Sequence, residues 1–226
     1  MEISVLILAS LNIEFPANVM AWVEQGLRWL HFLAGITWIG MLYFFNLVNV
    51  PLMKELDGGT KGKVIPRLMP RALWWFRWGA VWTVFAGLVY FIIYLMRDAG
   101  NAGGEASWGQ WFGLWFVVWV VAWAACYGLF MQKSGPLDDG RVLALVFSAV
   151  VAAASYAVLV LLAHPAISHK SLSIAVGGGM GLMMLLNVWG IIWRIQKKLI
   201  AWTAENAEKG TPMPPAWVYY VSTDDL

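Results

Sequence analysis

Five long runs of apolar residues limit this chain to one class of fold more strictly than any other feature of its sequence. A helix needs roughly 20 consecutive, mostly apolar residues to cross the hydrocarbon core of a bilayer. The runs that meet this length cover about residues 20–48, 71–96, 108–132, 140–163 and 171–196. The sequence therefore predicts an all-α, polytopic membrane helix bundle with five transmembrane helices.

The composition agrees with this class. Only 12% of the residues are charged and 61% are hydrophobic, whereas about a quarter of the residues in a soluble domain are charged. The net charge of +2 is too small for the basic surface of a nucleic-acid-binding protein. We therefore expect contact with the lipid bilayer and no nucleic-acid partner.

The remaining segments suggest a simple division of the chain. Residues 1–19 lack a basic start and carry Glu2, which is unlike a signal peptide, and we expect an interfacial segment there. Residues 20–198 form the predicted five-helix transmembrane domain. Residues 199–226 are too polar to span a membrane and are predicted to be a cytoplasmic tail.

Lysine and arginine are distributed unevenly between the predicted loops, which include DGGTKGK (57–63) after the first span and RDAGNAGGEAS (97–107) after the second. Arg28, Arg97 and Lys170 lie on one side of the predicted membrane. The other side carries Lys54, Lys61, Lys63, Arg67, Arg71, Lys133, Arg141, Arg194, Lys197 and Lys198. The positive-inside rule then predicts an outside N-terminus and a cytoplasmic C-terminus, in a bacterial inner membrane.

The first span carries a stripe of polar and small residues. Its members are spaced four, three, four and three residues apart, and these steps keep them on one helix face. They are Glu24, Arg28, His31, Gly35 and Trp38. We expect Glu24 and Arg28 to pair at i,i+4, and Gly35 to leave room for a bulky neighbour.

His31 is the candidate for chemistry, because ionisable residues inside a membrane are costly and usually face a cavity or the bundle interior. It could serve as an axial ligand of haem b, as a metal ligand or as a proton-handling group. The structural alternative is an interhelical hydrogen bond. His164, at the end of the fourth span, has a compatible depth for a second haem ligand, and a loop-lining role fits it equally well.

Aromatic and small residues recur at helical spacing in the other spans. Trp111, Trp115 and Trp119 repeat every four residues, as do Trp74, Trp78 and Trp82. Such rows pack helices together, although they could also stack against a quinone, haem or pigment. Ala149, Ala153 and Ala157 form a small stripe, and Gly177 and Gly181 match GxxxG, so both predict close helix packing. Asn187 needs a hydrogen-bond partner.

Three stretches resemble one family, the N-terminal membrane domain of bacterial urate oxidases. They are LRWLHFLAGITWIGMLYFFNLVNVPL, WWFRWGAVWTVFAG and VGGGMGLMMLLNVWGIIWRIQKK. The resemblance implies a multi-helix membrane domain that, in its full form, ends in a cytochrome c, oxidises urate and passes electrons to the respiratory chain. The matching positions are Arg28, Trp29, His31, Gly35, Trp38, Gly40, Arg77, Trp78 and Asn187.

The chain also departs from the family pattern. Gly79 and Ala175 stand where the pattern has a glutamate and a histidine, and the sequence contains no CxxCH haem-attachment motif. We therefore predict a small membrane subunit or module of a redox system, with haem b near the outer leaflet. The alternatives are a non-catalytic accessory subunit of a membrane complex and a truncated urate oxidase that passes electrons to a separate cytochrome c. Whether the chain is an enzyme, and which residues would be catalytic, stay open.

Overall fold

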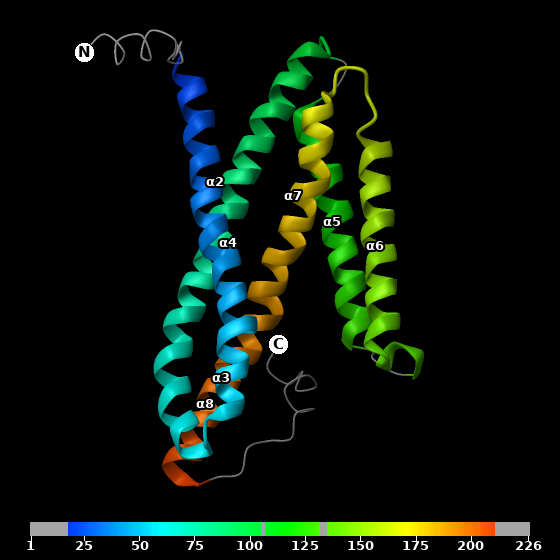
Figure 1. The fold of residues 1–226 in the computed structure, drawn as a ribbon. Helices are drawn as coiled ribbons and strands as arrows, with labels where there is room; N and C mark the ends of the chain where they lie inside the picture. Colours follow the sequence, from blue (N-terminus) through cyan, green and yellow to red (C-terminus); the bar gives the residue numbers. More distant parts are fainter. Residues whose placement is uncertain (1–17, 105–106, 132–134, 211–226) are drawn as a thin grey trace, which may run out of the picture.

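A computed structural model of the chain describes residues 18–104, 107–131 and 135–210 (Figure 1). The described residues form helices joined by short turns, and five of these helices are long and apolar enough to cross a membrane. The prediction of an all-α bundle with five spans is therefore confirmed, and it indicates a multi-pass membrane protein. Most of the predicted interfacial segment (1–19) and the last part of the predicted tail (211–226) lie outside the described residues.

Each predicted span corresponds to one helix or to one continuous series of helices. The first is α2 (Val19–Tyr43), the π-helical turn η1 (Phe44–Asn49) and α3 (Val50–Glu55). The middle spans are α4 (Gly58–Asn101), α5 (Trp108–Met131) and, after the turn η2 (Gly135–Asp138), α6 (Gly140–Leu161). The fifth is α7 (His169–Asn187), the π-helical turn η3 (Val188–Ile192) and α8 (Trp193–Lys209).

The helices form two groups on either side of α7 (Figure 1). α2 lies along α4, and α5 pairs with α6, while α7 contacts α4, α5 and α6. At the lower end of Figure 1, α8 packs against the beginning of α4. α7 thus connects the two groups and lies at the centre of the fold.

The helix α4 is longer than the sequence predicted. With 44 residues it extends about 66 Å, roughly twice the thickness of the hydrocarbon core. The predicted loop DGGTKGK is mostly its first turns, because the Asp57 carboxylate caps the helix. The Thr60 hydroxyl and backbone N–H donate to this carboxylate at 2.5 and 3.0 Å and lower the pKa of Asp57. At the other end, α4 continues to Asn101, well into the second predicted loop.

The predicted boundary of the tail at residue 199 falls inside α8. This helix continues to Lys209 and ends at Gly210, whose φ of +66° is the left-handed conformation that favours glycine. α8 lies close to α4 at Gly62, where a Cβ would collide with Ala207. Residues 199–209 are therefore held against α4 as a helical extension of the bundle.

The two rows of tryptophan face different surroundings. Trp111, Trp115 and Trp119 of α5 are almost completely buried, and the Trp115 indole donates to the Ala175 carbonyl at 2.7 Å. Trp74, Trp78 and Trp82 of α4 are 36–47% exposed. The α5 row therefore forms the core between α5 and α7, as a packing ridge would, whereas the α4 row faces outward.

The small residues predicted to pack helices do not lie at the closest contacts. A Cβ at Gly177 would meet no atom within 4 Å, and one at Gly181 would reach only Val84, at 4.0 Å. The close contact is instead at Gly179, where the Trp119 ring occupies the space of a side chain. Similarly, Ala149 and Ala153 are exposed while Ala154 is buried. Small residues therefore do mark close packing on α6 and α7, but the faces that pack are not the ones that the spacing predicted.

Candidate functional site

The polar stripe of the first span lies on the face of α2 that contacts α4. Glu24 and Trp38 are buried there, and a Cβ on Gly35 would lie 3.7 Å from the Thr83 side chain. Gly79 of α4 makes the closest approach, since a Cβ on it would lie 3.2 Å from the Trp38 backbone nitrogen. The predicted common face is thus the interface between these two helices.

The pairing predicted between Glu24 and Arg28 is wrong. Glu24 forms an ion pair with Arg97 of α4 and accepts a hydrogen bond from the Tyr94 hydroxyl at 3.1 Å. Arg28 instead donates to the Tyr90 hydroxyl at 2.6 Å. Both residues therefore bond to side chains of α4 and not to each other along α2.

His31 is oriented by the backbone of α4. Its Nδ1 lies 2.9 Å from the carbonyl oxygen of Thr83. A carbonyl oxygen can only accept, so Nδ1 carries a proton, and in the neutral ring the lone pair is then on Nε2. Gly87 leaves room for the ring, since a Cβ there would lie 3.3 Å from Nδ1. This is the arrangement in which histidine ligands of metals are usually held, with the second nitrogen bonded to a carbonyl.

His31 lines a cavity of about 670 Å³ between α2, α4 and α7, with Trp115 of α5 also in its wall. This volume is within the usual range for sites of small molecules and cofactors. Most of the lining is apolar. Arg28 and Tyr90 lie at one end of it, which we call its polar end, and His31 and Thr83 lie deeper along α2 and α4. Gly177 and Gly181 lie in the wall formed by α7, so the glycines predicted for packing leave space in the cavity instead.

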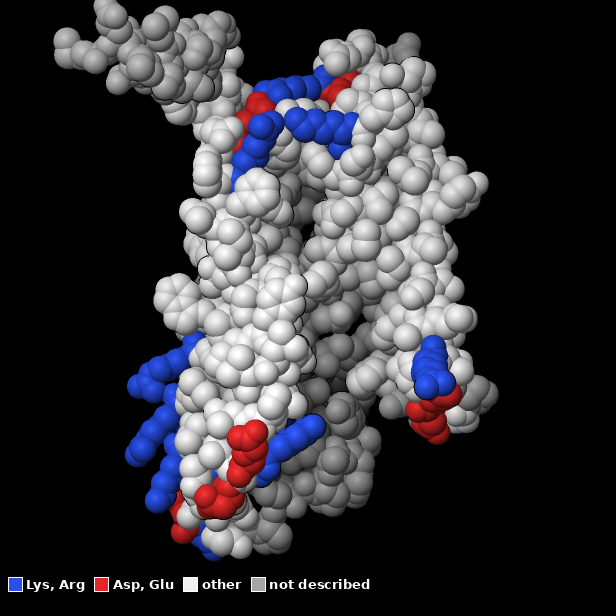
Figure 2. Space-filling view, in the orientation of Figure 1, with Lys and Arg blue, Asp and Glu red and all other residues white. Residues whose placement is uncertain are grey.

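Basic residues surround the polar end of the cavity. Lys170 of α7 donates to the Tyr94 hydroxyl at 2.6 Å and lies over both the Tyr90 and the Tyr94 rings. Arg28 and Lys170 have hydroxyl partners but no carboxylate partner among the described residues. We name Arg28, Tyr90, Tyr94 and Lys170 the tyrosine–cation cluster. Figure 2 shows basic and acidic side chains gathered at the upper end of the molecule, above the hollow between the helices.

A buried carboxylate joins α4 to α7 beside this cluster. Asp98 is only 4% exposed, and its Oδ2 accepts from the Ser168 backbone N–H at 3.1 Å and from the Ser168 and Ser171 hydroxyls at 3.2 and 2.5 Å. Ser168 is the N-cap of α7. The contact fixes the separation of α4 and α7 at the polar end of the cavity. It was not predictable from the sequence, in which Asp98 falls in a stretch with the composition of a loop.

His164 lies in the turn between α6 and α7. Its Nδ1 accepts from the Ala166 backbone N–H at 3.1 Å, and its ring packs 5.5 Å from that of Trp111, measured between ring centres. It does not line the cavity that His31 lines. The structure therefore does not bring together the two histidines expected to share a haem.

Among the other positions that match the urate oxidase pattern, Arg77 and Asn187 contact neighbouring tryptophans, whereas Trp29 is exposed. Arg77 lies 3.4 Å from the ring centre of Trp193 and also covers Trp189. Trp29 is 59% exposed. Asn187 has the partner it needed, the Trp123 indole at 2.8 Å. Among the described residues, no group of three or more histidine, cysteine, aspartate or glutamate side chains could hold a metal ion.

No protein-family model, curated protein or solved structure matches this chain.

Proposed function

We propose that this protein is a small membrane redox module that binds haem b in the cavity between α2, α4 and α7. The observation that carries the proposal is His31, whose Nδ1 is held by the Thr83 carbonyl at 2.9 Å while the ring borders a large apolar cavity. Nε2 would be the axial ligand. Haem supplies one-electron transfer when bound.

The shape and charge of the cavity support this cofactor. Gly177 and Gly181 carry no side chains into the cavity, which favours a flat ring system against α7. Arg28 lines its polar end, and Lys170 lies next to it over the Tyr90 ring. Neither has a carboxylate partner among the described residues, and both would pair with the two propionate groups of haem. Because His164 does not line the cavity, His31 would be the only histidine ligand.

Gly79 and Ala175 are the two positions at which the chain departs from the urate oxidase pattern. Their packing favours this redox module over the truncated urate oxidase. Any side chain at Gly79 would press on the backbone of Trp38 and Ala34, within 3.3 Å. Ala175 is fully buried, and its carbonyl accepts from Trp115. Both positions serve helix packing, which leaves no room for the two polar groups of the family pattern.

We also propose an orientation and a partner. Basic residues outnumber acidic ones around the start of α4 and the end of α7–α8, so this end would be cytoplasmic in a bacterial inner membrane. The tyrosine–cation cluster would then face outward. A cytochrome c or another membrane subunit would exchange electrons with the haem there.

Titration of the purified protein with haem b tests the proposal. The expected result is a Soret band that saturates at one haem per chain, with at least tenfold weaker binding in His31→Ala. His169→Ala is the matched control and should bind as the wild type does, because His169 is exposed at the start of α7. Unsaturable binding, or equal affinity in His31→Ala, would exclude the proposed site.

A further inference from the structure

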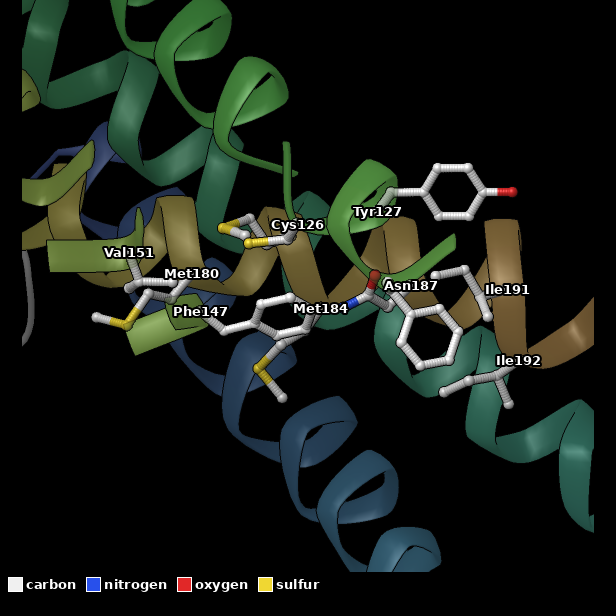
Figure 3. Close-up of a pocket in the computed structure, with 11 residues that line it drawn as sticks. Cys126, Tyr127, Phe147, Val151, Met180, Met184, Asn187, Ile191 and Ile192 are labelled. Carbon is white, nitrogen blue, oxygen red and sulfur yellow. The ribbon is translucent and has the colours of Figure 1, made fainter. Parts of the chain in front are cut away.

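A second cavity lies between α5, α6 and α7 (Figure 3). Its volume is about 500 Å³, and its lining contains apolar side chains together with Tyr127 and Asn187. None of its lining residues in the described part of the chain is charged. Met180 and Met184 line both this cavity and the one at His31.

Asn187 offers this cavity an oriented hydrogen-bond donor. The Trp123 indole N–H lies 2.8 Å from the side-chain amide of Asn187. An indole can only donate, so the amide atom facing it must be Oδ1, and Nδ2 must point the other way. Figure 3 shows Nδ2 directed toward Phe147 and Met184. The described residues provide no acceptor for it.

The orientation of Trp123 is itself fixed. Its ring stacks on Tyr127, with the ring centres 5.5 Å apart and the planes 15° from parallel. Gly190 leaves space for the indole, since a Cβ there would lie 3.3 Å from it. The amide of Asn187 is therefore held in place before any ligand arrives, which lowers the entropic cost of binding one.

A donor without an acceptor is unfavourable in an apolar, membrane-embedded cavity. A ligand that restores the hydrogen bond must carry an acceptor and dissolve in lipid. The described lining offers no charged partner, which disfavours fatty-acid carboxylates and phosphate headgroups. Thioether and aromatic side chains favour a flat ring, because sulfur makes favourable contacts with ring edges.

We infer that this cavity binds a lipid-soluble quinone, one carbonyl oxygen of which accepts a hydrogen bond from Asn187 Nδ2. The ring would lie against Phe147 and Met184, and the prenyl chain would leave toward the lipid. This inference concerns binding only. It stands whether or not haem binds at His31.

Equilibrium dialysis of the detergent-solubilised protein with a benzoquinone carrying one prenyl unit tests the inference. We expect saturable binding at one site and roughly five- to tenfold weaker binding in Asn187→Leu, which corresponds to the loss of one hydrogen bond. Ile191→Leu keeps the volume and polarity of the lining and should bind within about twofold of the wild type. A prenylbenzene without carbonyl groups should bind as weakly to the wild type as the quinone does to Asn187→Leu.

A second variant separates binding from folding, because Asn187→Leu also deprives Trp123 of its partner. Val151→Phe adds an aromatic ring to the lining of the cavity and leaves the bond between Asn187 and Trp123 in place. It should weaken quinone binding while the fluorine NMR signal of 5-fluorotryptophan at position 123 stays unchanged in the ligand-free protein. Unchanged affinity in both Asn187→Leu and Val151→Phe would overturn the inference, as would equal binding of the prenylbenzene.

Discussion

Single polar side chains inside the bundle are satisfied by partners on other helices, and this decides how far each could be predicted. The spacing of Glu24, Arg28 and His31 was sufficient to place them on one face of α2. Their partners were not predictable. Arg97 is 73 residues from Glu24, and the acceptor for His31 is a backbone carbonyl, for which no sequence signal exists. The i,i+4 pairing of Glu24 with Arg28 failed because local spacing says nothing about competing partners on α4.

Asp98 provides a stability test at the residue scale. Asp98→Ala removes the acceptor of three hydrogen bonds from Ser168 and Ser171. We expect it to lower the free energy of unfolding by about 3 kcal/mol, because buried donors lose a charged partner. Asp138→Ala, in the exposed turn before α6, is the control and should change it by less than about 0.5 kcal/mol. Denaturation in mixed detergent micelles measures both, and equal stabilities would refute the role of Asp98.

At the scale of helices, periodicity predicted the ridges but not the surfaces that receive them. The four-residue repeat of Trp111, Trp115 and Trp119 correctly indicated a packing row. GxxxG spacing then pointed to Gly177 and Gly181, whereas the ridge meets Gly179. A run of three consecutive glycines offers three helix faces, and only the tertiary arrangement of α5 and α7 selects one of them.

Substitutions in this run test the packing of α5 on α7. Gly179→Ala places a methyl group in the space of the Trp119 ring, and we expect destabilisation by about 1–3 kcal/mol through overpacking. Gly177→Ala meets no atom within 4 Å and should be neutral or stabilising by up to about 1 kcal/mol, since alanine is the better helix former. Thermal unfolding in detergent distinguishes the two. A larger loss of stability in Gly177→Ala than in Gly179→Ala would contradict the described packing.

At the scale of the whole molecule, the five spans were predictable because apolar length is a property of the sequence alone. The cavities were not, because each depends on the gap between three helices, and such gaps follow from crossing angles. Helix length beyond the bilayer was also missed. The first turns of α4 and the last turns of α8 are polar, so their sequence predicts a loop and a tail. In the structure they pack against each other at Gly62 and Ala207 and stabilise each other.

The proposed orientation can be tested with single cysteines in a Cys126→Ala background. A membrane-impermeant maleimide should label Asn101→Cys, at the end of α4, in intact cells. Asp138→Cys, in the turn before α6, should be labelled only after permeabilisation, because the positive-inside rule puts that end in the cytoplasm. The reverse pattern would invert the proposed topology and place the tyrosine–cation cluster inside.

The most direct test of the proposed haem site is chemical rescue of its ligand. His31→Gly removes the imidazole ring and leaves open the space beside Gly87 and the cavity. The protein purified from haem-supplied cells should show a Soret band, which His31→Gly should lose and which added imidazole should restore. A band that persists unchanged in His31→Gly, or a wild-type protein without one, would contradict the assignment of His31 as the haem ligand.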